Sequence, residues 1–89
     1  MSKSVIIDAG RSPVGIKNGQ MIGIRPEDLA AQIVTKLLER NNSISADMIE
    51  DVVVGCAFPE GPQGMNIGKT VGILGGLPEA STGKVVNRF

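Results

Sequence analysis

The stretch of residues 26–40 limits the possible folds most, because its apolar residues all fall on one side of a helix. They recur at the spacing of helical turns, at positions 29, 30, 33, 34, 37 and 38. Pro26 suits the first position of a helix, and Glu27 and Asp28 complement the positive end of the helix dipole. We therefore predict a helix that begins at Pro26, ends in a left-handed turn at the asparagine pair 41–42, and needs a second layer to cover its stripe.

Three short apolar runs predict buried strands. The runs lie at residues 4–9, 51–57 and 84–88 and are rich in valine and isoleucine. Their apolar residues are continuous rather than alternating, which is typical of strands covered on both faces. A strand, a helix and a second strand in succession favour a right-handed parallel crossover. The sequence thus predicts an α/β fold in which residues 4–9 form the first, central strand.

A second helix is predicted from Asn66, which can cap it, to about Leu74. Ile67, Val71 and Leu74 would form its buried face, and the Gly-Gly-Leu-Pro run at 75–78 would end it. Glycines recur every fourth residue at 68, 72 and 76, and an interior glycine costs a helix about 1 kcal/mol relative to Ala. Two explanations stay open: another backbone approaches this smooth face, or a weak helix is held only by tertiary packing.

The composition argues against several classes of function. The formal net charge is +0, so no basic field attracts nucleic acid or a membrane surface. The longest apolar runs are far shorter than the roughly 20 residues that span a bilayer. Strand-like residues begin at Val5, which leaves no room for a signal peptide. We expect a cytoplasmic protein with neither nucleic acid nor a membrane as its partner.

Missing residue types restrict the chemistry further. The chain has no His and one Cys, so its own residues cannot assemble a His/Cys zinc site or a His-activated nucleophile. We expect no bound metal and no bound cofactor. Cys56 lies in an apolar run without His, Lys or Arg beside it, and we interpret it as a small core residue rather than a nucleophile.

One glycine-rich turn comes close to a phosphate-binding loop. Residues 64–70 end in Gly-Lys-Thr, but three residues instead of four separate this triplet from the preceding glycine. Gln63 stands where the first glycine of such a loop belongs. A P-loop-like nucleotide binder is therefore a weak alternative, and Lys69 is expected to be a solvated helix residue.

Two further groups of charged residues fit solvated surface segments. Arg11 and Arg25 flank a glycine-rich stretch that could hold an anion, although a surface loop accounts for them better. Asp47, Glu50 and Asp51 are close in sequence, but nothing sets two carboxylates at a defined separation.

Several motifs stand in the order and spacing of the thiolase family. They are the start at residues 5–15 with Arg-Ser-Pro-Val-Gly, Pro-Glu-Asp-Leu at 26–29, the strand at 51–56, Gln-Gly-Met-Asn-Ile-Gly at 63–68, Gly-Gly-Leu-Pro at 75–78, and Val-Asn-Arg at 86–88. Each motif is weak alone, and Gly68 replaces a more usual Ala. As a set they cover nearly the whole chain, which resembles the amino-terminal part of a thiolase. The segments 60–66 and 86–88 look more like degradative 3-ketoacyl-CoA thiolases than biosynthetic ones.

The resemblance implies a fold and a reaction. It implies a thiolase-like fold of two α/β halves, in which residues 1–89 hold an incomplete first half, strand-helix-strand-helix-strand, of a mixed five-stranded sheet. No second domain would lie in this chain. A cysteine thiolate would attack a 3-ketoacyl-CoA, release acetyl-CoA and pass its acyl group to a second coenzyme A, a substrate rather than a cofactor. The family places that cysteine directly after the position of Phe89, so the chain alone is expected to be inactive.

The resemblance also implies partners. The full enzyme would bind acyl-CoA thioesters and form a homodimer or tetramer. Candidate residues of the dimer interface are Gln63, Asn66, Val85, Val86, Asn87 and Arg88. The alternative from another class is a small self-associating binding module, complete at 89 residues, with the loop after the second strand as its contact surface.

Overall fold

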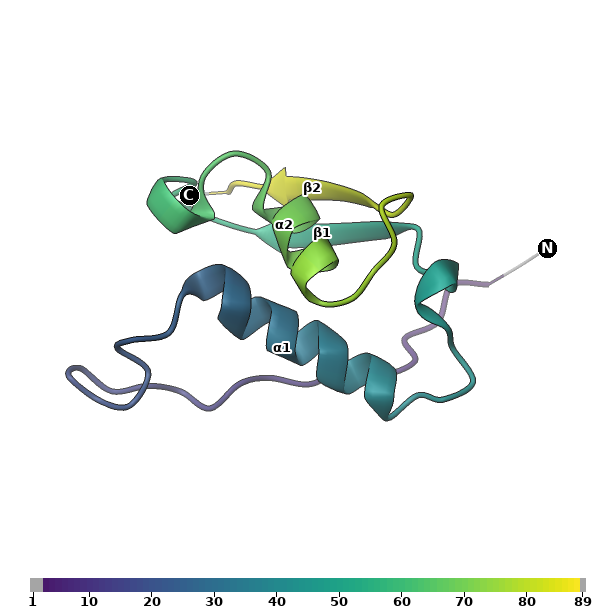
Figure 1. Cartoon of the computed structure of the whole chain (residues 1–89), viewed down its shortest axis with the longest axis horizontal. Helices are drawn as coiled ribbons and strands as arrows, with labels where there is room; N and C mark the ends of the chain where they lie inside the picture. The colour runs from purple at the N-terminus through teal and green to yellow at the C-terminus, as the bar shows by residue number, and fades with distance from the viewer. Residues whose placement is uncertain (1–2, 89) are drawn as a thin grey trace.

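The computed structural model describes residues 3–88. The elements in chain order are helix α1 (Pro26–Glu39), a single 3-10 turn (Ala46–Met48), strand β1 (Asp51–Gly55), a second 3-10 turn (Gly61–Gln63), helix α2 (Ile67–Leu74) and strand β2 (Thr82–Val86). The two strands pair in parallel, and α2 packs on both of them and on α1 (Figure 1). Neither helix of the described residues is long and apolar enough to cross a bilayer.

Helix α1 begins at Pro26, as predicted, but does not end as predicted. Glu27 is buried in its first turn, where its carboxylate accepts from Arg25 Nε at 2.7 Å. The last helical residue is Glu39, and Arg40 follows in a right-handed conformation. The prediction of a left-handed asparagine is therefore wrong. Asn41 instead caps the end with its side chain, whose Nδ2 donates to the Leu37 carbonyl at 2.7 Å.

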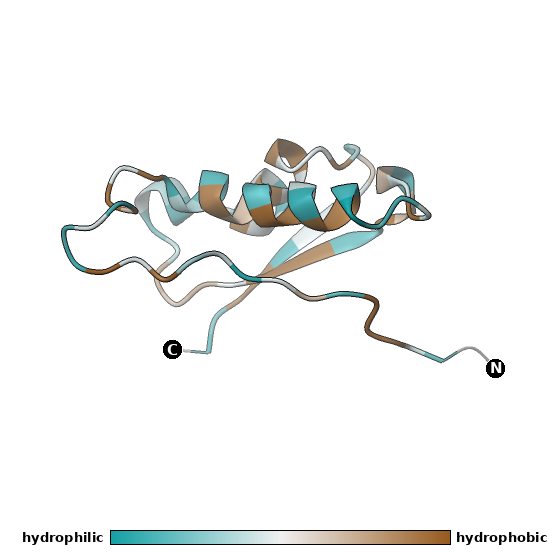
Figure 2. Ribbon diagram, turned by 90° about the horizontal axis from the view of Figure 1, so that it is seen from below, coloured by the Kyte–Doolittle hydropathy of each residue, from teal (hydrophilic) through white to brown (hydrophobic). Residues whose placement is uncertain are grey.

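Residues 4–9 are not a strand, which corrects the predicted strand order. They run as an extended segment outside the sheet, and Val5, Ile6 and Ile7 are 74%, 91% and 67% exposed. The predicted crossover from this segment to β1 is consequently not formed. A central strand needs a layer on each face, whereas Figure 2 shows the helices gathered above one side of the two strands. Within residues 3–88 this apolar run therefore has no second layer to bury it.

The unit β1-α2-β2 is the parallel crossover that the structure does contain. The register pairs Asp51 with Thr82 and Gly55 with Val86. Thr82 Oγ1 donates to Asp51 Oδ1 at 2.8 Å, and Lys84 Nζ lies 3.4 Å from Asp51 Oδ2. Strand β2 begins at Thr82, two residues before the predicted run of 84–88, and it ends at Val86, two residues before the end of that run.

Helix α2 follows the predicted cap closely. Asn66 Oδ1 accepts from the Lys69 amide at 3.1 Å. At the other end Gly76 has a φ of +95°, and the Leu77 amide donates to the Gly72 carbonyl at 2.9 Å. This is the left-handed helix end that glycine permits. Leu77 is thereby folded back into the core.

Gly68 of α2 faces a second backbone, as the first of the two open explanations requires, whereas Gly72 lies against the side chains of Val52 and Leu77. A Cβ on Gly68 would lie 2.6 Å from the Lys84 carbonyl oxygen, and one on Gly83 would overlap the backbone of Lys69. Strand and helix therefore touch backbone to backbone. Ile67 and Val71 are buried as predicted, but the buried face turns toward the glycines, so Leu74 is 50% exposed and the prediction for it is wrong.

Candidate functional site

The carboxyl ends of the two strands form the candidate site. The two strands run in parallel, so the chain leaves both of them at the same edge of the sheet (Figure 1). The Cys56 amide donates to the Val86 carbonyl at 3.0 Å, and Asn87 Nδ2 donates to the Ala57 carbonyl at 3.3 Å. Open α/β sheets place their ligand sites at this edge.

Cys56 is half-buried at this edge rather than in the core. Its Sγ lies 3.6 Å from Gln63 Nε2, which also donates to the Phe58 carbonyl at 2.9 Å. The expectation of a core residue therefore holds only in part. An amide donor cannot take a proton, so the contacts of Cys56 within residues 3–88 give it none of the bases that activate a nucleophile.

The six interface candidates differ in exposure. The amides of Gln63, Asn66 and Asn87 each donate to a carbonyl of this chain. Val86 is 40% exposed and Arg88 is exposed, whereas Val85 is half-buried. Phe89 lies outside the described residues. Four of the six, Asn66, Val86, Asn87 and Arg88, are thus exposed, and Gln63 and Val85 are half-buried.

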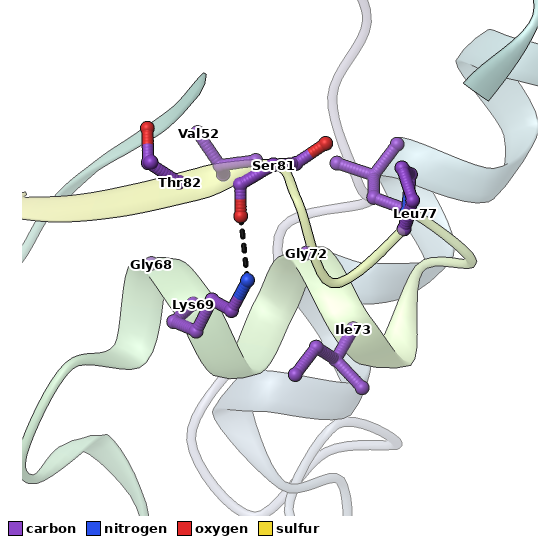
Figure 3. A pocket seen from close by; sticks show the side chains of 9 residues that line it. Val52, Gly68, Lys69, Gly72, Ile73, Leu77, Ser81 and Thr82 are labelled. Carbon is purple, nitrogen blue, oxygen red and sulfur yellow. Dashed lines mark hydrogen bonds between the residues drawn. The ribbon is translucent and has the colours of Figure 1, made fainter. Parts of the chain in front are cut away.

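Lys69 is not the solvated residue that the sequence predicts. Its ammonium donates to the carbonyls of Glu79 at 2.5 Å and Ser81 at 2.6 Å, and Figure 3 shows the second of these bonds. A lysine held by two carbonyls is not available for a phosphate. The geometry therefore removes the support that the Gly-Lys-Thr triplet lends to nucleotide binding.

Of the other charged candidates, Asp51 joins the two strands, and the two arginines make local contacts. Hydrogen bonding from the Thr82 hydroxyl, together with Lys84, lowers the pKa of Asp51. Arg25 pairs with Glu27, and Arg11 Nη1 donates to the Ser12 carbonyl at 3.0 Å. In the part of the chain that the structure describes, no group of three His, Cys, Asp or Glu residues is placed to hold a metal ion.

One polar cluster joins the amino-terminal segment to the end of α1 without any local sequence signal. Arg40 Nε and Asn41 Nδ2 both donate to Asp8 Oδ2 at 2.7 Å, and Arg40 Nη2 reaches Asp8 Oδ1 at 2.5 Å. Arg40, followed by Asn41, lowers the pKa of the Asp8 carboxyl well below its usual range. The cluster fastens the amino-terminal segment to the end of α1. Its partners are more than 30 residues apart, so no local pattern indicates it.

Comparisons with known proteins identify the family of this parallel α/β unit. Residues 4–89 match the family model described as "Thiolase, N-terminal domain". The chain is 42% identical over 86 residues to the 3-ketoacyl-CoA thiolase of Alcanivorax borkumensis, and the match covers 96% of the chain and 22% of that protein. It is 39% identical to the 3-ketoacyl-CoA thiolase of Bacillus subtilis, covering 100% of the chain and 23% of that protein.

A third relative is named for a different substrate. The chain is 38% identical over 89 residues to the beta-ketoadipyl-CoA thiolase of Escherichia coli, covering 100% of the chain and 22% of that protein. The chain thus spans less than a quarter of the length of these curated relatives. Fold and match agree on the class, an α/β thiolase-like domain. The chain belongs to the thiolase family and corresponds to part of its amino-terminal domain.

Proposed function

We propose that the protein carrying this chain is a thiolase that cleaves 3-ketoacyl-CoA with coenzyme A, or runs the reverse condensation of two acetyl-CoA. The observation that carries the proposal is the match of residues 4–89 to the thiolase amino-terminal domain. The names of the relatives support a 3-ketoacyl-CoA as the substrate class. The segments 60–66 and 86–88 support the degradative type, and hence a place in fatty acid β-oxidation.

The nucleophile of this proposal is a cysteine that follows Phe89 in the full protein. Strand β2 leads to it, and its carboxyl end lies at the edge where α/β sheets place their sites. The thiolate attacks the ketone carbon, the carbon–carbon bond to the departing acetyl-CoA breaks, and the acetyl-CoA carbanion takes up a proton. The acyl group is then transferred from the cysteine sulfur to the thiol sulfur of a second coenzyme A, which regenerates the free cysteine. Cys56, whose contact is the Gln63 amide, is not the nucleophile.

The sheet of this proposal is larger than the two strands described. Val53 is 58% and Val86 is 40% exposed, whereas Val52 points toward α2. One face of the pair is therefore covered and the other leaves apolar side chains open, although a stable layer buries both. Residues 1–89 would be part of one domain with a mixed five-stranded sheet. In a cytoplasmic homodimer or tetramer, the β2 edge with Val85, Val86 and Arg88 would face a second subunit.

A parallel assay tests the proposal. The full-length protein and the 89-residue chain are each incubated with acetoacetyl-CoA and coenzyme A, and the disappearance of the 3-ketoacyl-CoA absorbance is followed. We expect turnover by the full-length protein and none by the chain alone. Absence of turnover in a folded full-length protein would refute the thiolase assignment, and turnover by the 89-residue chain would refute the placement of the nucleophile.

One observation supports the alternative of a self-associating module. Val5, Ile6, Ile7 and Val53 are more than half exposed, and exposed apolar residues beside open strand edges favour pairing with another chain. A full-length protein that lacks thiolysis but forms a stable complex through the β2 edge would favour the module over the enzyme.

A further inference from the structure

Two side chains of α2 hold the backbone that runs through β2. Lys69 Nζ donates to the carbonyls of Glu79 and Ser81, just before the strand begins (Figure 3). Asn66 Nδ2 donates to the Gly83 carbonyl at 2.8 Å, inside the strand. The charge on Lys69 makes its bonds of the stronger kind. Helix and strand are therefore joined at two points along the chain direction.

The bonds of Lys69 and Asn66 lie beside a backbone contact between α2 and β2, where no side chain can absorb a shift. The backbones of Gly68 and Gly83 meet directly, because a Cβ on either would overlap the other element. On the opposite edge of β2, the pairing with β1 begins at Asp51 and Thr82. A displacement of α2 is therefore transmitted to β2, an extended strand that advances about 3.3 Å per residue.

We propose that Lys69 and Asn66 are positioning residues for the nucleophile, and this rests on the function proposed above. They touch neither substrate nor a reacting atom. Their bonds fix the position of β2 relative to α2, both along the strand and across it. They thereby fix the point at which the chain leaves the strand after Val86. A misplacement of about 1 Å can reduce a rate about 100-fold, so a loosened strand would slow the chemical step.

Substitutions can separate the positioning role of these two residues from their role in folding. Asn66 has two bonds, one accepted from the Lys69 amide as helix cap and one donated to Gly83. Asn66→Asp keeps the cap, since Asp caps helices as well as Asn does, but removes the donor to the strand. Lys69→Met removes both carbonyl contacts, and Lys69→Arg keeps a charged donor for them. Lys36→Met is the matched control, because Lys36 is exposed on α1 and pairs only with Glu39 in the described residues.

The experiment uses the full-length protein and measures kcat, KM, thermal stability and the pH dependence of inactivation by iodoacetamide. We expect Lys69→Met and Asn66→Asp to lower kcat about 10- to 100-fold with little change in KM. The alkylation profile should shift to higher pH, because a displaced thiolate loses part of its activation. Lys69→Arg should recover most of kcat, and Lys36→Met should match the wild type.

Two results would overturn the inference. If both variants melt earlier but keep the wild-type kcat and alkylation profile, the two residues serve stability alone. If Lys69→Arg is as slow as Lys69→Met, the carbonyl contacts are not the cause. If Lys69→Met does not fold, Asn66→Asp decides by itself. A wild-type protein without thiolysis would instead refute the proposed function, and with it any nucleophile to position.

Discussion

The left-handed glycine at the end of α2 gives a prediction that separates backbone strain from packing. Gly76 has a φ of +95°, and a Cβ built there meets nothing within 4 Å. Gly76→Ala therefore introduces no collision. It only forces an L-residue into a conformation that costs about 1–2 kcal/mol.

A matched control measures the opposing effect. Ala in place of Gly also lowers the entropy of the unfolded chain, which stabilises by about 0.4–1 kcal/mol where the backbone allows it. Gly55 likewise has open space around its position and does not have a positive φ. Gly55→Ala therefore reports the entropic gain without the strain, and the two variants should differ by about 1–2 kcal/mol.

The assay is urea unfolding of the 89-residue chain at low concentration, followed by circular dichroism, with thermal unfolding as a second measure. A difference of 1 kcal/mol should appear as about 4–8 °C in Tm for a domain of this size. Gly76→Asn should lose less than Gly76→Ala, since Asn tolerates left-handed backbone. Equal stability of the Gly76→Ala and Gly55→Ala variants would refute the assignment of Gly76 as a required left-handed residue.

Three further predictions concern the core, the polar cluster around Asp8 and the exposed edge of β2. Val71→Ala should destabilise by about 1.5–3 kcal/mol because Val71 is 2% exposed, whereas Val53→Ala, at 58% exposure, should change urea unfolding by less than about 0.5 kcal/mol. The pKa of Asp8 is lower in the folded than in the unfolded chain, so its contribution to the free energy of unfolding is complete above the unfolded pKa of about 3.9 and is lost as pH falls toward the folded pKa. Asp8→Asn should therefore flatten the acid side of the curve of stability against pH. An unchanged acid side would contradict the role of the Asp8 cluster. The 89-residue chain should self-associate in sedimentation at high concentration, and Val86→Lys should weaken this association; a monodisperse wild-type monomer would speak against an exposed apolar edge.

Local signals predicted the helices because their causes lie within a few residues. Pro26 begins α1, and Asn66 caps α2 through the amide three residues later. The glycine spacing in α2 left a close neighbour as one of two explanations, and β2 is that neighbour for Gly68. Each of these features depends on backbone geometry that a short stretch of sequence determines.

Long-range conditions account for the errors. Residues 4–9 have the composition of a central strand, but a central strand depends on layers that other segments must supply. Lys69 looks like a surface lysine because its two carbonyl partners lie 10 and 12 residues further on. Asp8 and Arg40 meet across 32 residues, and no motif marks them.

The motif order predicts that the chemistry lies after β2, and this location stays a prediction. The structure adds the contacts at the end of that strand, where the Val86 carbonyl accepts from the Cys56 amide and Cys56 Sγ lies near Gln63 Nε2. The sequence could not show that the amides of Gln63 and Asn66 each donate to a backbone carbonyl. The bond from Asn66 to Gly83 depends on the packing of α2 against β2, and the bond from Gln63 to Phe58 depends on the fold of the loop after β1.

Mapping the acyl-enzyme tests the central claim most directly. The full-length protein is incubated with acetoacetyl-CoA in the absence of free coenzyme A, quenched, digested and examined by mass spectrometry. We predict an acyl group on a cysteine directly following Phe89 and an unmodified Cys56. An acyl group on Cys56, or on no cysteine of an otherwise active protein, would contradict the claim that β2 carries the nucleophile.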